Sequence, residues 1–201
     1  LATDPINWQS LLFQTGYLTL KKEYFEQQLV TLAYPNREVE LSMNSYLLAT
    51  FRNGLPDDSV PFFQNLKNAL QSAQIPEFIT LINALFASIP YQLFDQKREG
   101  FFHAILHLTF KGIGLFVQSE VSTSKGRVDC VVQLQDHVYV IEFKLDASAK
   151  DALDQIREKR YGTSFLGAGK KVVALGINFS SSTRTIESWE AVDYTQLLTE
   201  G

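Results

Sequence analysis

The chain has 201 residues, of which 45% are hydrophobic and 20% are charged, and its formal net charge is −4. This composition excludes an intrinsically disordered chain and argues against a protein that binds nucleic acid through its overall charge. The single cysteine, Cys130, excludes an intramolecular disulfide framework and indicates a cytoplasmic protein, and neither a signal peptide nor an apolar run long enough to cross a bilayer is found.

The first part of the chain, residues 1–54, alternates between helical and strand-like patterns. Because it begins at Leu1 without a methionine, we expect a fragment of a longer protein or a processed one. The predicted elements are a helix at residues 6–15 that ends near Gly16, strands at 17–22 and 26–35, and a helix at 37–51 capped by Asn36. This order predicts a small winged-helix-like segment.

The next part, residues 55–93, is predicted to be helical. A run of glycine, proline and aspartate at residues 52–59 is typical of a linker. Apolar residues then recur at helical spacing over residues 60–73 and 77–89. We therefore expect a helical bridge that packs on the C-terminal part.

Residues 94–201 predict an α/β domain with a mixed central sheet flanked by helices. The expected elements are a helix at 95–112, strands at 115–121, 128–134 and 138–145, a helix at 148–161, and strands at 170–179 and 187–192. The helical crossover before residues 170–179 predicts a parallel, right-handed connection to an earlier strand.

The hairpin formed by residues 128–134 and 138–145 carries the candidate site. A turn centred on Gln135 and Asp136 places residue 129 opposite residue 142. Since directly opposed residues point to the same face, Asp129, Glu142 and Lys144 are expected to converge. Two carboxylates at cross-strand distance repel one another unless a cation lies between them, and Mg²⁺ or Mn²⁺ fits such oxygen ligands. The alternative is a solvated sheet face on which these groups only form ion pairs.

Several other residues have both a structural and a functional interpretation. His103 and His107 lie four apart on a helix, but no third zinc ligand suggests itself, so a structural role is favoured. Cys130 is expected in the core, because alternation directs it away from the acids. Residues 167–171 lack the spacing of a phosphate-binding loop.

Basic residues are enriched in the last part of the chain, which is compatible with binding to a phosphate backbone or with solvated helix faces. They are Lys125, Arg127, Lys144, Lys150, Arg157, Lys159, Arg160, Lys170 and Lys171. Arg127 has a simpler alternative, which is pairing with Glu120 or another acidic residue.

The order of these elements and four phrases in them, EGFFHAIL, GRVDCVV, VIEFKLD and ALDQIREKRYG, resemble the PD-(D/E)XK nuclease superfamily. The closest likeness is to the nuclease-like domain at the C-terminal end of certain bacterial AAA-ATPase-like proteins. The N-terminal phrases LLFQTGYLTL and YPNREVELS look like the tail of the ATPase portion of those proteins. The resemblance implies a restriction-endonuclease-like core of helix, three strands, helix and strand.

The resemblance assigns roles to individual residues. It makes Asp129 and Glu142 the metal-binding acids and Lys144 the catalytic lysine, while Glu99 matches an additional acid on the preceding helix and Gln155 a glutamine on the following one. The resemblance also implies the backbone carbonyl of Phe143 as a further metal ligand. The motif's proline is absent, since Val128 precedes the first acid.

The implied activity is metal-dependent hydrolysis of phosphodiester bonds in nucleic acid, with DNA favoured. Candidate phosphate contacts are Arg127, Arg157, Lys159 and Arg160. An ATPase-like region in the full-length chain is the expected partner. The alternative function is a catalytically inactive module of the nuclease fold that binds nucleic acid or a protein.

Overall fold

A computed structural model of the protein describes residues 7–51, 59–90, 99–113, 116–123, 126–167 and 169–199. Contacts between residues divide the chain into two compact units, Leu1–Asn44 and Ser45–Gly201. The domain boundaries expected after residues 54 and 93, and all but the last residue of the expected linker, lie outside the described residues, so these boundaries stay predictions.

The N-terminal unit contains the helix and the hairpin expected from the sequence. Its elements are α1 (Trp8–Gln14), β1 (Thr19–Tyr24), a 3₁₀ turn (Phe25–Gln27), β2 (Leu29–Ala33) and the start of α2 (Arg37–Phe51). The two strands pair antiparallel. As predicted, the Asn36 side chain caps α2, because its Oδ1 accepts the Val39 N–H at 2.9 Å.

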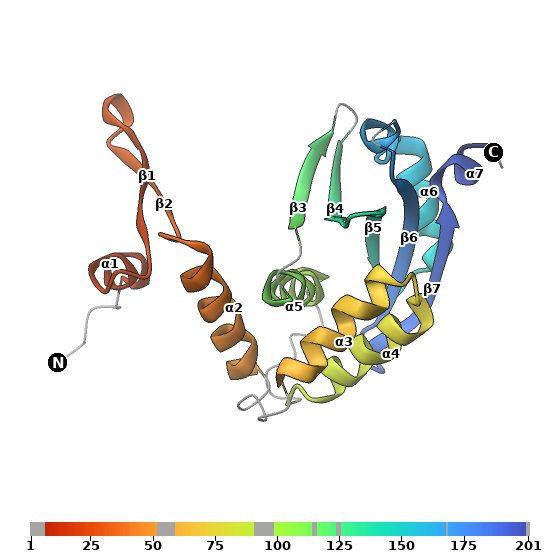
Figure 1. The fold of residues 1–201 in the computed structure, drawn as a ribbon, viewed down its shortest axis with the longest axis horizontal. Coiled ribbons are helices and arrows are strands. Elements are labelled where there is room, and N and C mark those ends of the chain that lie inside the picture. The colour runs from red at the N-terminus through yellow and green to blue at the C-terminus, as the bar shows by residue number, and fades with distance from the viewer. Residues whose placement is uncertain are drawn as a thin grey trace. The chain divides into compact units, whose positions relative to one another are not determined.

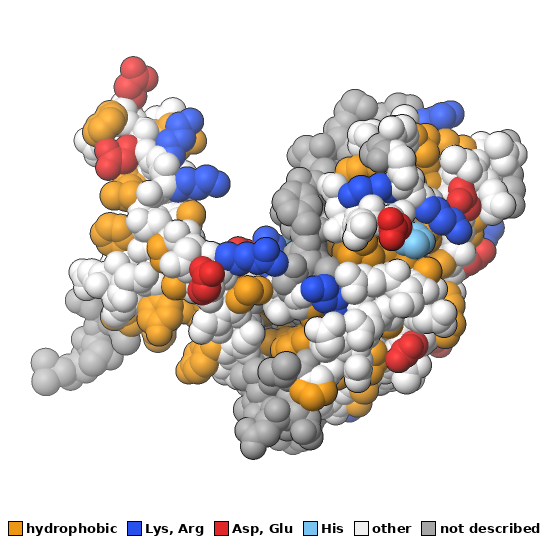
Figure 2. All heavy atoms as spheres, viewed as in Figure 1, with side chains coloured by type: hydrophobic (Ala, Val, Ile, Leu, Met, Phe, Trp, Pro, Cys, Tyr) orange, Lys and Arg blue, Asp and Glu red, His pale blue; other side chains and the backbone are white. Residues whose placement is uncertain are grey.

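Large apolar side chains remain on the surface of this unit. The helix α1 has no buried residue, and Trp8 and Phe25 are 63% and 83% exposed. Figure 2 shows hydrophobic side chains (orange) over the visible face of the N-terminal segment. The segment therefore buries little of its own apolar surface among the described residues.

The C-terminal unit is a five-stranded mixed sheet covered by helices on both faces. Its strands are β3 (Phe116–Thr123), β4 (Gly126–Gln133), β5 (His137–Leu145), β6 (Lys171–Ser180) and β7 (Thr185–Asp193). They lie side by side in chain order, with β5 and β6 parallel and the other pairs antiparallel (Figure 1). The helices are α3 (Ser59–Gln71), α4 (Ile75–Ala87), α5 (Glu99–Gly112), α6 (Ala149–Lys159) and α7 (Tyr194–Thr199). The predicted fold class is confirmed.

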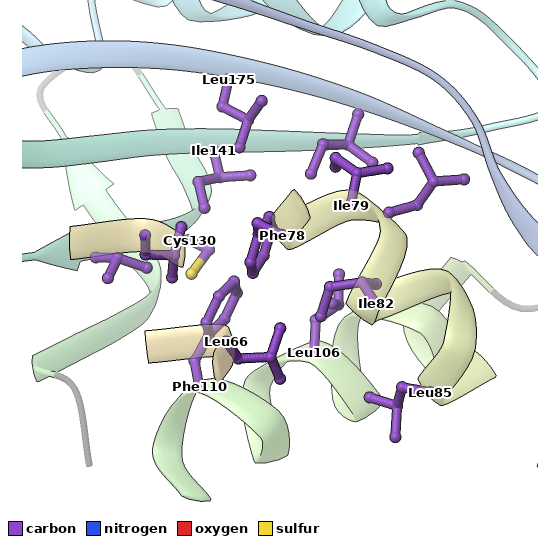
Figure 3. Packing of buried hydrophobic residues seen from close by; sticks show 14 of the residues in the cluster. Leu66, Phe78, Ile79, Ile82, Leu85, Leu106, Phe110, Cys130, Ile141 and Leu175 are labelled. Atoms are coloured by element: carbon purple, nitrogen blue, oxygen red, sulfur yellow. The ribbon is translucent and has the colours of Figure 1, made fainter. Parts of the chain in front are cut away.

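One face of the sheet packs against α3, α4 and α5 in a single hydrophobic cluster. Figure 3 shows how Cys130, Ile141 and Leu175, from three neighbouring strands, meet Phe78 of α4 and Phe110 of α5. The Phe78 and Phe110 rings are stacked, with centroids 5.9 Å apart. The helices of the expected bridge thus share the core of the sheet.

Alternation along β5 separates two kinds of side chain. Ile141 and Phe143 belong to the cluster with α3, α4 and α5, whereas Val138 and Val140 belong to a second cluster with α6 and α7. Glu142 follows Val140 by two residues and therefore faces α6.

The helices after β5 differ from the sequence prediction in two details. The helix α6 ends at Lys159 rather than at residue 161, because Arg160 adopts φ +54° and the Tyr161 N–H bonds back to the Ile156 carbonyl. The short helix α7 was not predicted. Among the described residues, none of the helices combines the length and the apolar character that a membrane span requires.

Candidate active site

The acids lie where the strands β4 and β5 stop pairing. Their antiparallel ladder ends at the pair Cys130 and Ile141, one residue before the position where Asp129 faces Glu142. The turn that joins them is closed by the Leu134 N–H, which donates to the His137 carbonyl at 2.8 Å. It is centred on Gln135 and Asp136, so the predicted register is confirmed.

Beyond the ladder, the two carboxylates bond to the backbone of the opposite strand. The Phe143 N–H donates to Asp129 Oδ2 at 2.9 Å, and the Asp129 N–H lies 3.4 Å from Glu142 Oε2. Side-chain bonds have thus replaced backbone pairing at this point. Both acids are held where β4 and β5 separate, beyond the pair Cys130 and Ile141, and we call this place the strand opening.

Glu142 is almost completely buried, with 2% of its side chain exposed. A buried carboxylate is costly unless it has bonding partners. The Gln155 amide of α6 donates to Glu142 Oε1, and Lys144 Nζ lies 3.7 Å from the same oxygen. Lys144 Nζ also donates to Gln155 Oε1 at 2.5 Å. This burial is incompatible with the alternative of a freely solvated sheet face.

A glycine lets α6 come close enough for Gln155 to reach this cluster. Gly176 of β6 is the register partner of Glu142. A Cβ on Gly176 would lie 2.3 Å from the Ala149 carbonyl oxygen and 3.0 Å from Leu153 Cγ. A glycine inside an apolar strand is the sequence signal for such a close approach.

The turn between β5 and α6 is fixed on β6. Asp146 has φ +54°, and its carboxylate accepts the Ser181 hydroxyl at 2.6 Å and the Ser181 N–H at 2.7 Å. These two hydrogen bonds lower the pKa of Asp146, and the bond from the Ser181 hydroxyl has the larger effect. The Ala147 N–H donates to Oδ1 of the buried Asn178 at 2.9 Å.

Sequence reasoning missed this support, although one signal was available. Asn178 is a polar residue within the apolar run of residues 171–180 and is 2% exposed. Its register partner on β5 is Lys144. A buried polar residue beside a strand end points to a bonding role there.

The helix α5 approaches the acids from the other side. His103 Nε2 lies 3.8 Å from Asp129 Oδ2, and the His103 and Phe143 ring centroids are 5.0 Å apart. Sequence reasoning gave His103 a structural role and did not place it beside Asp129. Glu99 is the first residue of α5, but its side chain lies outside the described part of the structure.

Two of the predicted phosphate contacts lie at the start of β4 or beside it. Lys159 Cδ is 3.8 Å from the position that a Cβ on Gly126 would occupy. Arg127, the next residue along β4, is exposed. The end of α6 therefore adds to the positive charge at the start of β4.

The other two predicted phosphate contacts have different surroundings. Arg157 Nη2 lies 2.9 Å from Asp154 Oδ1 and already forms an ion pair within α6. Arg160 is exposed but belongs to the helix cap rather than to the helix. Both side chains remain candidates for contacts with phosphate.

Cys130 is a core residue, as predicted. It is 3% exposed, and burial together with the negative charge of Asp129 raises the pKa of its thiol. The neutral thiol is a poor nucleophile.

The residues at the strand opening fit a hard divalent cation. Among the described residues there is no group of three or more histidine, cysteine, aspartate or glutamate side chains able to hold a metal. Mg²⁺ needs fewer protein ligands than three, since it is commonly bound by one or two carboxylates and keeps several waters. Asp129 and Glu142 supply two carboxylates at one opening, and the Phe143 carbonyl lies in the same stretch of β5.

The mixed sheet and its flanking helices are consistent with a restriction-endonuclease-like fold. Residues 97–189 match the family described as the PD-(D/E)XK nuclease superfamily. The match extends from before α5 into β7 and therefore includes Asp129, Glu142 and Lys144.

A second comparison covers both units of the chain. It is 34% identical over 191 residues to a protein of Azotobacter chroococcum mcd 1 named "Uncharacterized protein in vnfD 5'region". The alignment covers 90% of this chain but only 36% of that relative, so the chain spans about a third of the relative's length. No solved structure matches the chain.

Proposed function

We propose that the C-terminal unit is a metal-dependent nuclease that hydrolyses phosphodiester bonds of nucleic acid. The observation that carries the proposal is the buried Glu142 carboxylate, held by Gln155 beside Asp129 and Lys144. It lies within the segment that matches a nuclease superfamily. A chain without catalytic use for these groups has no need to bury such a charge.

In this proposal Asp129 and Glu142, with the Phe143 carbonyl and Glu99, are the ligands of Mg²⁺ or Mn²⁺. A bound cation would lower the pKa of a water ligand and neutralise charge on the scissile phosphate. The Gln155 amide orients the Glu142 carboxylate and keeps the Lys144 ammonium close to it.

Lys144 supplies positive charge at the place where negative charge develops on the phosphate. Its side chain is 24% exposed, whereas Glu142 beside it is almost inaccessible, so the ammonium can meet a substrate that the carboxylate alone would repel. Lys144 would position the attacking water or stabilise the transition state.

The proposal includes a substrate and a setting. Arg127, Arg157, Lys159 and Arg160 would contact phosphates, with DNA as the favoured substrate, which makes binding weaker at high salt. The N-terminal segment would belong to an ATPase-like region of a longer cytoplasmic protein. The relative's greater length is compatible with that arrangement.

The test is cleavage of plasmid, single-stranded DNA and RNA in Mg²⁺ or Mn²⁺. We expect the wild type to cleave at least one of them and Lys144→Ala to lose at least 100-fold in rate, since a lost electrostatic donor costs about 10²–10³. Asp129→Ala should also lose cleavage, because it removes a proposed metal ligand. Lys150→Ala is the matched control, because Lys150 is 75% exposed and only pairs with Asp154. Cleavage unchanged in both site variants would refute the proposal.

Metal binding gives a second readout. We expect Mn²⁺ to raise the melting temperature of the wild type and not that of Asp129→Ala. Stabilisation of the wild type by metal without any cleavage would favour the inactive, nucleic-acid-binding alternative.

A further inference from the structure

A pocket of about 400 Å³ opens between α5 and the strands β4 and β5. Its apolar lining includes Leu106, Phe110 and Phe143, and its polar lining includes His103, His107 and Asp129. Pockets for small organic ligands span roughly 300–1,000 Å³. This one is therefore large enough for a single nucleotide base.

The pocket shares a wall with the candidate active site. Asp129 lines it, and the Asp129 carboxylate is also bonded to the Phe143 N–H at the strand opening. A phosphate held at that opening is joined to its own base through one sugar. The pocket therefore lies next to the position that the base attached to the scissile phosphate would occupy.

The lining has the chemistry that holds an unstacked base. Proteins hold such bases by stacking them on aromatic side chains, including histidine, and by hydrogen bonds to their edges. The His103 ring packs on Phe143, with 5.0 Å between centroids and 51° between ring planes, at the side of the pocket nearest Asp129. His107 lines the same pocket one helical turn further along α5 and adds a second imidazole ring to its lining.

We propose that this pocket holds one unpaired nucleobase of the strand being cleaved. The proposal rests on the proposed nuclease function and adds the substrate class to it. A base that enters the pocket has left its base pair, so single-stranded or frayed nucleic acid is the preferred substrate over intact duplex. Unstacking and unpairing cost energy in a duplex and little in a single strand.

The experiment fills the pocket without disturbing the core. Ala104 lines the pocket from an exposed position of α5, so Ala104→Trp introduces an indole at its rim. Ala84→Trp is the matched control, since Ala84 is also exposed on a helix and does not line the pocket. Both proteins are assayed with a 20-nucleotide single strand and with its blunt duplex in Mn²⁺.

The single strand is also made with one abasic residue at successive positions. Loss of the stacked base is expected to slow cleavage of the adjoining bond roughly 5- to 150-fold, while the other bonds of the same strand are cut at the normal rate. Ala104→Trp is expected to lose a similar factor on the single strand and Ala84→Trp to lose none. The duplex is expected to be cut at least tenfold more slowly than the single strand by wild type.

Equal rates on single strand and duplex, or equal rates for Ala104→Trp and wild type, would overturn the pocket proposal and leave the nuclease intact. If wild type cuts nothing, the nuclease proposal fails, and binding decides about the pocket. A single strand containing 2-aminopurine should then change its fluorescence with wild type and not with Ala104→Trp. The same fluorescence change with both proteins would overturn the proposal.

Discussion

Replacing Gly176 by alanine tests how tightly α6 is set against the sheet. A Cβ at this position would lie 2.3 Å from the Ala149 carbonyl oxygen, whereas carbon and oxygen normally approach to roughly 3.3 Å. The obstacle is backbone, so it cannot rotate away. The first turn of α6 must move by about 1 Å.

Two consequences follow from that displacement. Overpacking of this kind typically costs about 1–3 kcal/mol of the free energy of unfolding. Gln155 moves with α6 and loses its contacts with Glu142 and Lys144. A misplacement of about 1 Å can cost roughly 10²-fold in rate, so Gly176→Ala should also be a poor nuclease if the proposed function holds.

The free energy of unfolding is measured by urea denaturation followed by circular dichroism. Gly100→Ala is the control, because a Cβ on Gly100 meets nothing within 4 Å, and alanine is the better helix former by up to about 1 kcal/mol. We expect Gly176→Ala to be destabilised and Gly100→Ala not. If Gly176→Ala were within about 0.5 kcal/mol of wild type, the range of ordinary surface substitutions, the tight contact would be disproved.

Three further predictions concern single side chains. Gln155→Ala removes the amide shared by the buried carboxylate and the lysine of the site, and should lower the free energy of unfolding by about 1–3 kcal/mol in urea titrations. Asp146→Asn tests pH dependence: because bonds from Ser181 lower the pKa of Asp146, its stabilisation is present above the ordinary value of 3.8 and is lost as pH falls through the lower folded pKa. The stability difference between wild type and variant should therefore be larger at pH 7 than at pH 3. The Cys130 thiol, whose pKa is raised by burial and by Asp129, should react with a disulfide reagent at neutral pH only in urea.

Each of these has a clear contrary result. A Gln155→Ala protein as stable as wild type would mean that water replaces the amide without cost. If the stability difference between Asp146→Asn and wild type were the same at both pH values, the charge of the Asp146 carboxylate would not contribute to stability. Rapid reaction of native protein would place Cys130 at an accessible surface.

The hairpin could be read from the sequence because its information is local. Two apolar runs around Gln135 and Asp136 specify the turn, and the turn alone determines that residue 129 faces residue 142. The parallel pairing of β6 with an earlier strand was also predictable, since a helical crossover connects them, but the sequence did not identify β5 as that strand.

What could not be predicted depends on contacts between distant residues. The place where β4 and β5 stop pairing has no signature in the alternation of either strand. The approach of His103 to Asp129 depends on how α5 lies on the sheet, and the bond from Ala147 to Asn178 spans 31 residues. Side chains of this kind are found only once the packing of the layers is known.

The register of the β4–β5 hairpin also protects the site against misfolding. Side chains repeat every two residues along a strand, so a slip of one residue would turn Val140 and Glu142 towards the helices α3, α4 and α5. That alternative would desolvate Glu142 in the larger hydrophobic cluster and bring Ile141 and Phe143 out of it. The wrong pairing is thus opposed by the same apolar residues that stabilise the right one. Selection for a stable sheet therefore also preserves the alignment of Asp129 with Glu142.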